Sequence, residues 1–108
     1  MSALATTDRL IARSPEAAAA AVRALVKTQA ALKADVTRAT EVGRKLFPPA
    51  EAELIAELIR RDLPYYDPSI SPDFVAGMNQ FARDIGILRG PVPYEKVVAT
   101  RFAGLWRA

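Results

Sequence analysis

The sequence contains neither cysteine nor histidine. The absence of cysteine excludes disulfide bonds, thiolate nucleophiles, iron–sulfur clusters and cysteine-ligated zinc. The absence of histidine removes the commonest general base and, together with cysteine, the commonest metal ligands. We therefore expect no catalytic residue, no metal site and no cofactor, and the chain is not predicted to be an enzyme.

Aromatic side chains and long apolar runs are also scarce. Aromatic residues make up 7% of the 108 residues, while a hydrophobic share of 51% is inflated by alanine. Small side chains that pack closely favour helices over a sheet. No apolar run approaches the ~20 residues of a membrane span, and no basic-then-apolar leader opens the chain. The sequence predicts a single domain over residues 1–108 without a membrane span or an export signal.

Charge is distributed unevenly, with a net charge of +3. Residues 1–45 hold 8 basic and 4 acidic side chains but no aromatic one, whereas residues 46–108 hold 7 basic and 8 acidic side chains. Proteins that bind nucleic acids usually combine clustered Lys and Arg with aromatic residues. A nucleic-acid partner is therefore not expected.

Two Ser-Pro-acid sequences predict helix starts, because they combine a side-chain cap, proline at the first helical position and a carboxylate near the positive end of the dipole. The first, at Ser14, begins a helix to about Lys33. The second, at Ser71, begins a helix that Gly86 ends in the left-handed conformation. The residues expected to face the core are Val22, Leu25, Val26 and Leu32 in the first helix, and Val75, Met78, Phe81, Ala82 and Ile85 in the second.

Two further helices are predicted between these starts. Asp35 caps the first of them, whose apolar stripe contains Val36, Ala39, Val42, Gly43 and Leu46, and Pro48 ends it. The other runs from Pro49 to Leu63 and is expected to bury Leu54, Ile55, Leu58 and Ile59. A last short helix begins near Tyr94. The fold class is therefore mainly α, a bundle of four to five short helices.

The N-terminal segment 3–12 fits neither the helical nor the strand period. Thr6, Thr7 and Ile11 nevertheless favour a strand. An unpaired strand edge invites association, so this segment is the expected pairing element if the chain forms oligomers.

Four groups of residues were weighed as functional sites against simpler structural roles. Tyr65 and Tyr66 are interpreted as clamping their loop, with Asp67 bonded to backbone amides, and not as a ligand pocket. The serines lack a histidine to activate them and are assigned to capping. The acidic group is interpreted as a solvated helix face and not as a metal site; it consists of Glu51, Glu53, Glu57 and Asp62. The basic group is interpreted as surface charge and not as an anion site; it consists of Arg9, Arg13, Arg23 and Lys27.

Five segments in order resemble the C-terminal part of substrate-binding proteins of bacterial ABC importers. The segments are 5–16 (ATTDRLIARSPE), 63–71 (LPYYDPSIS), 81–88 (FARDIGIL), 91–98 (PVPYEKVV) and the alanine-rich helix after residue 16. The branch that they resemble is the NMT1/THI5-like one, whose members deliver nitrate, sulfonates, taurine or pyrimidine precursors of thiamine.

The resemblance implies part of the C-terminal α/β lobe of a type II periplasmic binding protein, with 3–12 in the place of a family strand. Thr6 and Thr7 then match the segment that approaches the ligand cleft, and they are the candidate ligand-binding residues. A small polar or anionic solute and an ABC permease are the implied partners, and the periplasm is the implied compartment. The eukaryotic branch that makes the thiamine pyrimidine uses a histidine that this chain lacks, which disfavours an enzyme.

Two functions follow as hypotheses. The first is a non-catalytic fragment or truncated relative of a solute-binding protein, which captures solute only together with the missing lobe. The alternative is a stand-alone helical interaction module that forms homo-oligomers through the surface left by that lobe. If Met1 is the natural start, the lack of an export signal predicts a cytoplasmic protein.

Overall fold

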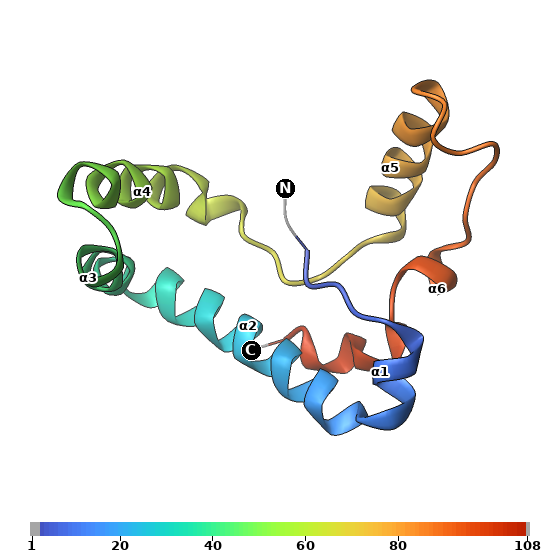
Figure 1. Ribbon diagram of the computed structural model, residues 1–108, viewed down its shortest axis with the longest axis horizontal. Helices are drawn as coiled ribbons and strands as arrows, with labels where there is room; N and C mark the ends of the chain where they lie inside the picture. The colour runs from blue at the N-terminus through green and yellow to red at the C-terminus, as the bar shows by residue number, and fades with distance from the viewer. Residues whose placement is uncertain (1–2, 108) are drawn as a thin grey trace.

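The protein is built from helices, as a computed structural model covering residues 3–107 describes it (Figure 1). Those residues contain no strand, and the mainly α fold class is confirmed. The α-helices are α1 (Asp8–Arg13), α2 (Pro15–Ala34), α3 (Thr37–Leu46), α4 (Pro49–Asp62), α5 (Pro72–Asp84) and α6 (Tyr94–Val97), and the 3-10 helices are η1 (Leu63–Tyr65) and η2 (Thr100–Leu105).

The expected strand within residues 3–12 is wrong. Residues 3–7 have no regular structure and are followed by α1. Thr7 is extended, and its Oγ1 accepts a hydrogen bond from the N–H of Leu10 at 3.1 Å. A threonine that can satisfy a free N–H at a helix start favours the helix over a strand that has no partner. The segment therefore offers no strand edge for pairing.

Helix α2 is the longest element, and α1 and η2 both pack against it (Figure 1). Its predicted bounds are confirmed, with Pro15 in the first turn. Val26 is buried as expected, whereas Leu25 is exposed, so the buried stripe is narrower than predicted. Ser14 stands at the helix start but its side chain makes no capping hydrogen bond, which corrects its assigned role.

Helices α3 and α4 form a hairpin whose two-residue connection is Phe47 and Pro48. Its seam consists of small residues, since Gly43, Ala52 and Ala56 are buried. The expected burial of Leu54 and Leu58 is wrong, because these side chains are 59% and 40% exposed. Small residues let two helix axes approach closely, so the small side of α4 takes the contact and the leucines face away from it.

Helix α5 begins and ends as predicted. The Ser71 hydroxyl accepts a hydrogen bond from the N–H of Phe74 at 3.1 Å, and Gly86 follows with a φ of 80°. The expected docking of the helix through Met78 and Phe81 is wrong, since both side chains are more than half exposed. The predicted burial of Val75 is confirmed, because it lies on a different side of the helix from those two residues.

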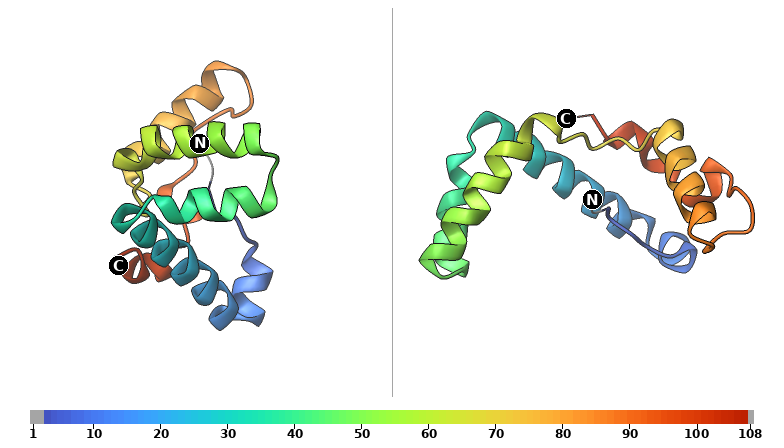
Figure 2. Two further views of the ribbon diagram at one scale, coloured as in Figure 1. Left: turned by 90° about the vertical axis from the view of Figure 1, so that its left-hand side faces the viewer. Right: turned by 90° about the horizontal axis from the view of Figure 1, so that it is seen from above.

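Two hydrogen bonds hold the loops on either side of α5. The Asn79 amide donates to the Val92 carbonyl at 2.9 Å, and the Tyr94 hydroxyl donates to the Ile70 carbonyl. Figures 1 and 2 show α5 on the side of the molecule opposite the α3–α4 hairpin, with α2 running between them. The two hydrogen bonds thus tie α5 and the loops that flank it to one another at one end of the molecule.

The described residues enclose a small core. Buried apolar residues are Ala18, Val26, Ala52, Ala56, Val75, Val98 and Phe102. The radius of gyration is 16.6 Å, against about 13 Å for a compact domain of this length. The accessible surface is 8314 Å², against about 5,900 Å² for a compact protein of 11.7 kDa. The helices therefore form an open arrangement that leaves much apolar surface uncovered.

Candidate functional site

Thr6 and Thr7 lie in the exposed segment that leads into α1. Thr7 lines an open hollow of about 410 Å³ together with Arg9, Leu10, Arg13 and Ser14. Its hydroxyl oxygen already accepts the N–H of Leu10, so one of its lone pairs is used in capping α1. Thr6 does not line this hollow. The structure therefore brings only one of the two predicted ligand residues to a concave surface, and their ligand-binding role stays a prediction.

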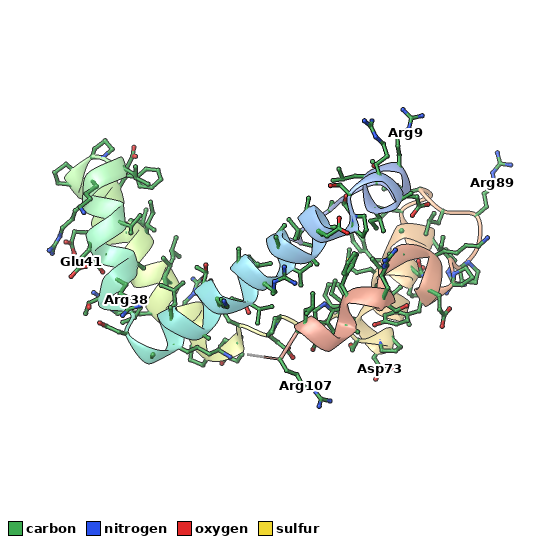
Figure 3. All side chains as sticks on the ribbon, turned by 90° about the horizontal axis from the view of Figure 1, so that it is seen from below. Arg9, Arg38, Glu41, Asp73, Arg89 and Arg107 are labelled. Carbon is green, nitrogen blue, oxygen red and sulfur yellow. The ribbon has the colours of Figure 1, made fainter. Side chains whose placement is uncertain are left out.

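The basic residues of the N-terminal half do not converge on one point. Arg9 and Arg13 share the hollow at α1, whereas Arg23 and Lys27 lie on α2, exposed to solvent. Figure 3 shows Arg9 pointing away from the ribbon, as does Arg89 beyond α5. Separated and solvated guanidinium groups match the interpretation of these residues as surface charge.

The Tyr65–Asp67 segment has a structural arrangement. Asp67 Oδ1 accepts hydrogen bonds from the backbone N–H of Ser69 at 2.9 Å and from its hydroxyl at 2.7 Å. These two hydrogen bonds hold the pKa of the Asp67 carboxyl below its usual value, and the bond from the Ser69 N–H has the larger effect. The turn role of Asp67 is confirmed. Tyr65 is 84% exposed, so its ring does not clamp the loop as expected.

Two of the acidic residues of α4 form ion pairs with arginines. Among residues 3–107, no group of three or more acidic side chains is placed to hold a metal ion. Glu53 pairs with Arg44 at 3.6 Å, and Asp62 pairs with Arg61 at 2.7 Å. The Arg61 hydrogen bond also holds the pKa of Asp62 below its usual value. These contacts lie at the surface, as the sequence predicts for a solvated helix face.

The α3–α4 hairpin has two chemically different faces. At about 100° per residue, Arg44 and Glu53 lie on the same side of the small-residue seam, and their ion pair joins the two helices there. The same count places a set of apolar side chains on the opposite side of the seam in both helices. We call this set the hairpin apolar face; it consists of Val42, Leu46, Ile55 and Leu58.

The hairpin apolar face is open to solvent in the isolated chain. Leu46 is 70% exposed and Val42 is 54% exposed, and Ile55 is half-buried. At the tip of the hairpin, Phe47 adds an exposed ring. Large apolar side chains gathered on one face, with ion-paired residues on the other, are typical of a surface that contacts another protein element.

Helix α5 carries a second, narrower apolar stripe. Phe74, Met78, Phe81 and Ile85 are exposed and recur at spacings of four, three and four residues. This spacing keeps them on one side of the helix. The stripe is a single helix wide, whereas the hairpin apolar face extends across two helices.

Sequence reasoning identified the residues of both surfaces except Phe74 but assigned them to the interior. Periodicity identifies an apolar stripe without saying what covers it. The sequence did contain one signal, the small residues Gly43, Ala52 and Ala56, whose spacing matches a close contact between two helices. If these small residues form the contact, the leucines of α4 lie outside it.

No helix within residues 3–107 combines the length and the apolar character needed to cross a membrane. Comparison of the chain with protein-family models, with curated proteins and with solved structures found no match in any of the three.

Proposed function

We propose that this chain is the helical part of a solute-binding protein of an ABC importer, and that it contributes to solute capture only when a complementary lobe is present. The chain has no catalytic role in this proposal. The solute is a small polar or anionic compound of the sulfonate, nitrate or aminopyrimidine type, and Thr6 and Thr7 contact it from one wall of the cleft. Solute that touches both lobes only when they are closed favours the closed state.

The observation that carries this proposal is the amount of uncovered surface. The chain exposes about 2,400 Å² more than a compact protein of its mass. Large side chains on α3, α4 and α5 contribute to it. A chain that relies on another lobe to complete its core has this property, and the ordered motifs at 5–16, 63–71, 81–88 and 91–98 indicate which lobe that is.

The experiment compares this chain with the same chain extended by the residues encoded upstream in the same reading frame. Thermal unfolding is followed with taurine, other sulfonates, nitrate and an aminopyrimidine. A solute present at about 100 times its Kd stabilises a binding protein by about 2.7 kcal/mol. We expect one solute class to stabilise the extended protein and none to stabilise the chain alone. A folded extended protein that no solute stabilises contradicts the proposal.

Replacement of the predicted contact residues separates their role from folding. Thr6→Ala in the extended protein is expected to weaken solute binding without lowering stability, because the Thr6 side chain is exposed to solvent. Thr7→Ala is expected to weaken binding and also to destabilise α1, whose cap it removes. Unchanged solute affinity in both variants would remove Thr6 and Thr7 from the site.

The second candidate function is a stand-alone helical module that associates with itself. The specific observation in its favour is the hairpin apolar face, which belongs to two helices and is uncovered in one chain. Association through this face needs no additional lobe. The hairpin replaces segment 3–12 as the element expected to form the contact.

A further inference from the structure

We propose that a second copy of this chain covers the hairpin apolar face, so that the α3–α4 hairpins of two copies form a four-helix bundle. This inference rests on the second candidate function, self-association, and names its surface and geometry. Antiparallel helix pairs that pack through apolar stripes form such bundles, with charged residues outside. In a twofold arrangement the same face serves both partners.

The first support is the way in which the hairpin separates its side chains. The Arg44–Glu53 ion pair fixes the polar face, since it crosses the seam on one side. Counted from Gly43, Val42 and Leu46 of α3 lie at about 60–100° to the other side of that seam. Counted from the midpoint of Ala52 and Ala56, Ile55 and Leu58 of α4 lie at about 80–140° to the same side. Because the two helices are antiparallel, these directions coincide in space. The apolar residues of both helices therefore lie on one side of the seam, and the same count places Glu51 and Asp62, near the two ends of α4, on that side as well.

The second support is the area. A standard interface buries about 800 Å² on each partner, and obligate homodimers bury more. The chain exposes about 2,400 Å² beyond the expectation for a compact monomer. Burying one hairpin face against its copy removes part of this excess without any change within the chain. The remainder includes the stripe on α5.

The third support is the charge of the hairpin. Residues 37–62 contain five basic side chains (Arg38, Arg44, Lys45, Arg60 and Arg61) and five acidic ones (Glu41, Glu51, Glu53, Glu57 and Asp62), so their net charge is zero. The +3 of the whole chain lies outside this range. Two hairpins can therefore approach without the repulsion that like-charged surfaces of two identical copies would produce.

The test measures the oligomeric state of three proteins by sedimentation velocity between about 1 µM and about 1 mM, a range that covers ordinary dimer affinities. They are the unmodified chain, Leu46→Glu on the hairpin apolar face and Phe81→Glu on the α5 stripe. Leu46 and Phe81 are 70% and 57% exposed, so both changes place a carboxylate on an apolar side chain that is open in one chain. Circular dichroism confirms that helix content is retained.

We expect the unmodified chain and Phe81→Glu to dimerise, and Leu46→Glu to raise the dimer Kd by at least about a hundredfold, because each dimer then buries two carboxylates. A monomeric unmodified chain over the whole range overturns both the inference and self-association as a function. A dimer that Phe81→Glu dissociates and Leu46→Glu does not overturns the inference alone. Neither result bears on solute binding, which is measured separately.

A second measurement does not depend on the charged variants. Because the chain has no cysteine, Leu46→Cys and Phe81→Cys each introduce one thiol without background. We expect the Leu46→Cys thiol to react at least about tenfold more slowly with a thiol reagent when the protein is mostly dimer than when it is dilute. The Phe81→Cys thiol should react at the same rate in both conditions. Equal protection of the two thiols, or none at Leu46→Cys, contradicts the proposed face.

Discussion

At the scale of single residues, the two serines that precede proline show how one sequence pattern has two outcomes. Ser14 and Ser71 are each followed by proline and an acidic residue. Only the side-chain hydroxyl of Ser71 accepts a hydrogen bond from a backbone N–H of its helix, that of Phe74 at 3.1 Å. Ser14 follows directly after α1, and its own N–H donates to the Leu10 carbonyl at 2.8 Å. Its backbone thus serves the end of one helix while its side chain makes no capping bond in the next.

This difference predicts different costs for the same substitution. Ser71→Ala is expected to lower the free energy of unfolding by about 1 kcal/mol, since it leaves a free N–H at the start of α5. Ser14→Ala should change it by less than about 0.5 kcal/mol. Urea unfolding followed by circular dichroism measures both values. Equal losses in the two variants would show that the Ser71 hydroxyl does not act as a cap.

A second prediction at this scale concerns pH. The Ser69 hydrogen bonds lower the pKa of Asp67 in the folded chain, so its contribution to stability is fully present above the usual carboxyl pKa. That contribution is lost as the pH falls through the lowered pKa, which places the change below about pH 4. Asp67→Asn keeps an acceptor oxygen but cannot titrate.

We therefore expect the free energy of unfolding of Asp67→Asn to fall less steeply below about pH 4 than that of the unmodified chain. Urea titrations at a series of pH values measure the slopes. Asp35 also has a lowered pKa, caused by the Thr37 hydroxyl and then by the Thr37 N–H, and it titrates in both proteins. Identical slopes would mean that the Asp67 turn contributes nothing to acid sensitivity.

At the scale of elements, the sequence predicted where the main helices begin and end better than which sides they bury. Pro15, Pro49 and Pro72 each stand at a helix start, and Gly86 follows the end of α5. These signals are local, because they depend on backbone angles and on hydrogen bonds between near neighbours. The burial of Leu54, Met78 and Phe81 depends on distant elements. Periodicity could not identify those elements.

In the candidate site, too, roles that depend on neighbouring residues were predicted better than burial that depends on distant elements. Asp67 was assigned correctly from its neighbours, since an aspartate before proline readily bonds to the backbone two residues on. The residues of the hairpin apolar face were assigned to the interior, because the sequence of α4 offers both small and large apolar residues and only contact with α3 decides which of them are buried. Thr7 was expected in a strand and caps α1.

The small-residue seam of the hairpin predicts a stabilising substitution. A Cβ built at Gly43 lies 3.9 Å from the Cβ of Ala52, an ordinary contact distance. Gly43→Ala is therefore expected to raise the free energy of unfolding by about 0.4–1 kcal/mol, because alanine loses less backbone entropy in a helix. Thermal unfolding should show a rise of several degrees.

Gly86→Ala serves as the control for this effect. Gly86 has a φ of 80°, where an alanine Cβ is strained, so this variant is expected to lose about 1 kcal/mol although the space around it is open. Destabilisation by Gly43→Ala would show that α3 and α4 are closer than the 3.9 Å contact indicates.

At the scale of the whole molecule, the small core makes the proposed dimer a source of stability. The buried apolar residues are mostly alanine and valine, with Phe102 as the one large side chain among them. A protein that dimerises in its folded state is stabilised by mass action. The thermal midpoint of the unmodified chain is therefore expected to rise with protein concentration, and that of Leu46→Glu to stay constant. Differential scanning calorimetry at several concentrations measures both.

The pair of hydrogen bonds around α5 has a consequence for the order in which the molecule opens. The Tyr94 hydroxyl and the Ile70 carbonyl are 24 residues apart, so their bond closes a loop that contains all of α5. While this hydrogen bond is formed, the two ends of the loop stay together, so the entropic cost of loop closure has already been met. Helix α5 then stays close to the turns that precede and follow it. The amide hydrogens of residues 72–84 should then exchange with solvent as one cooperative unit, separate from those of α2 to α4.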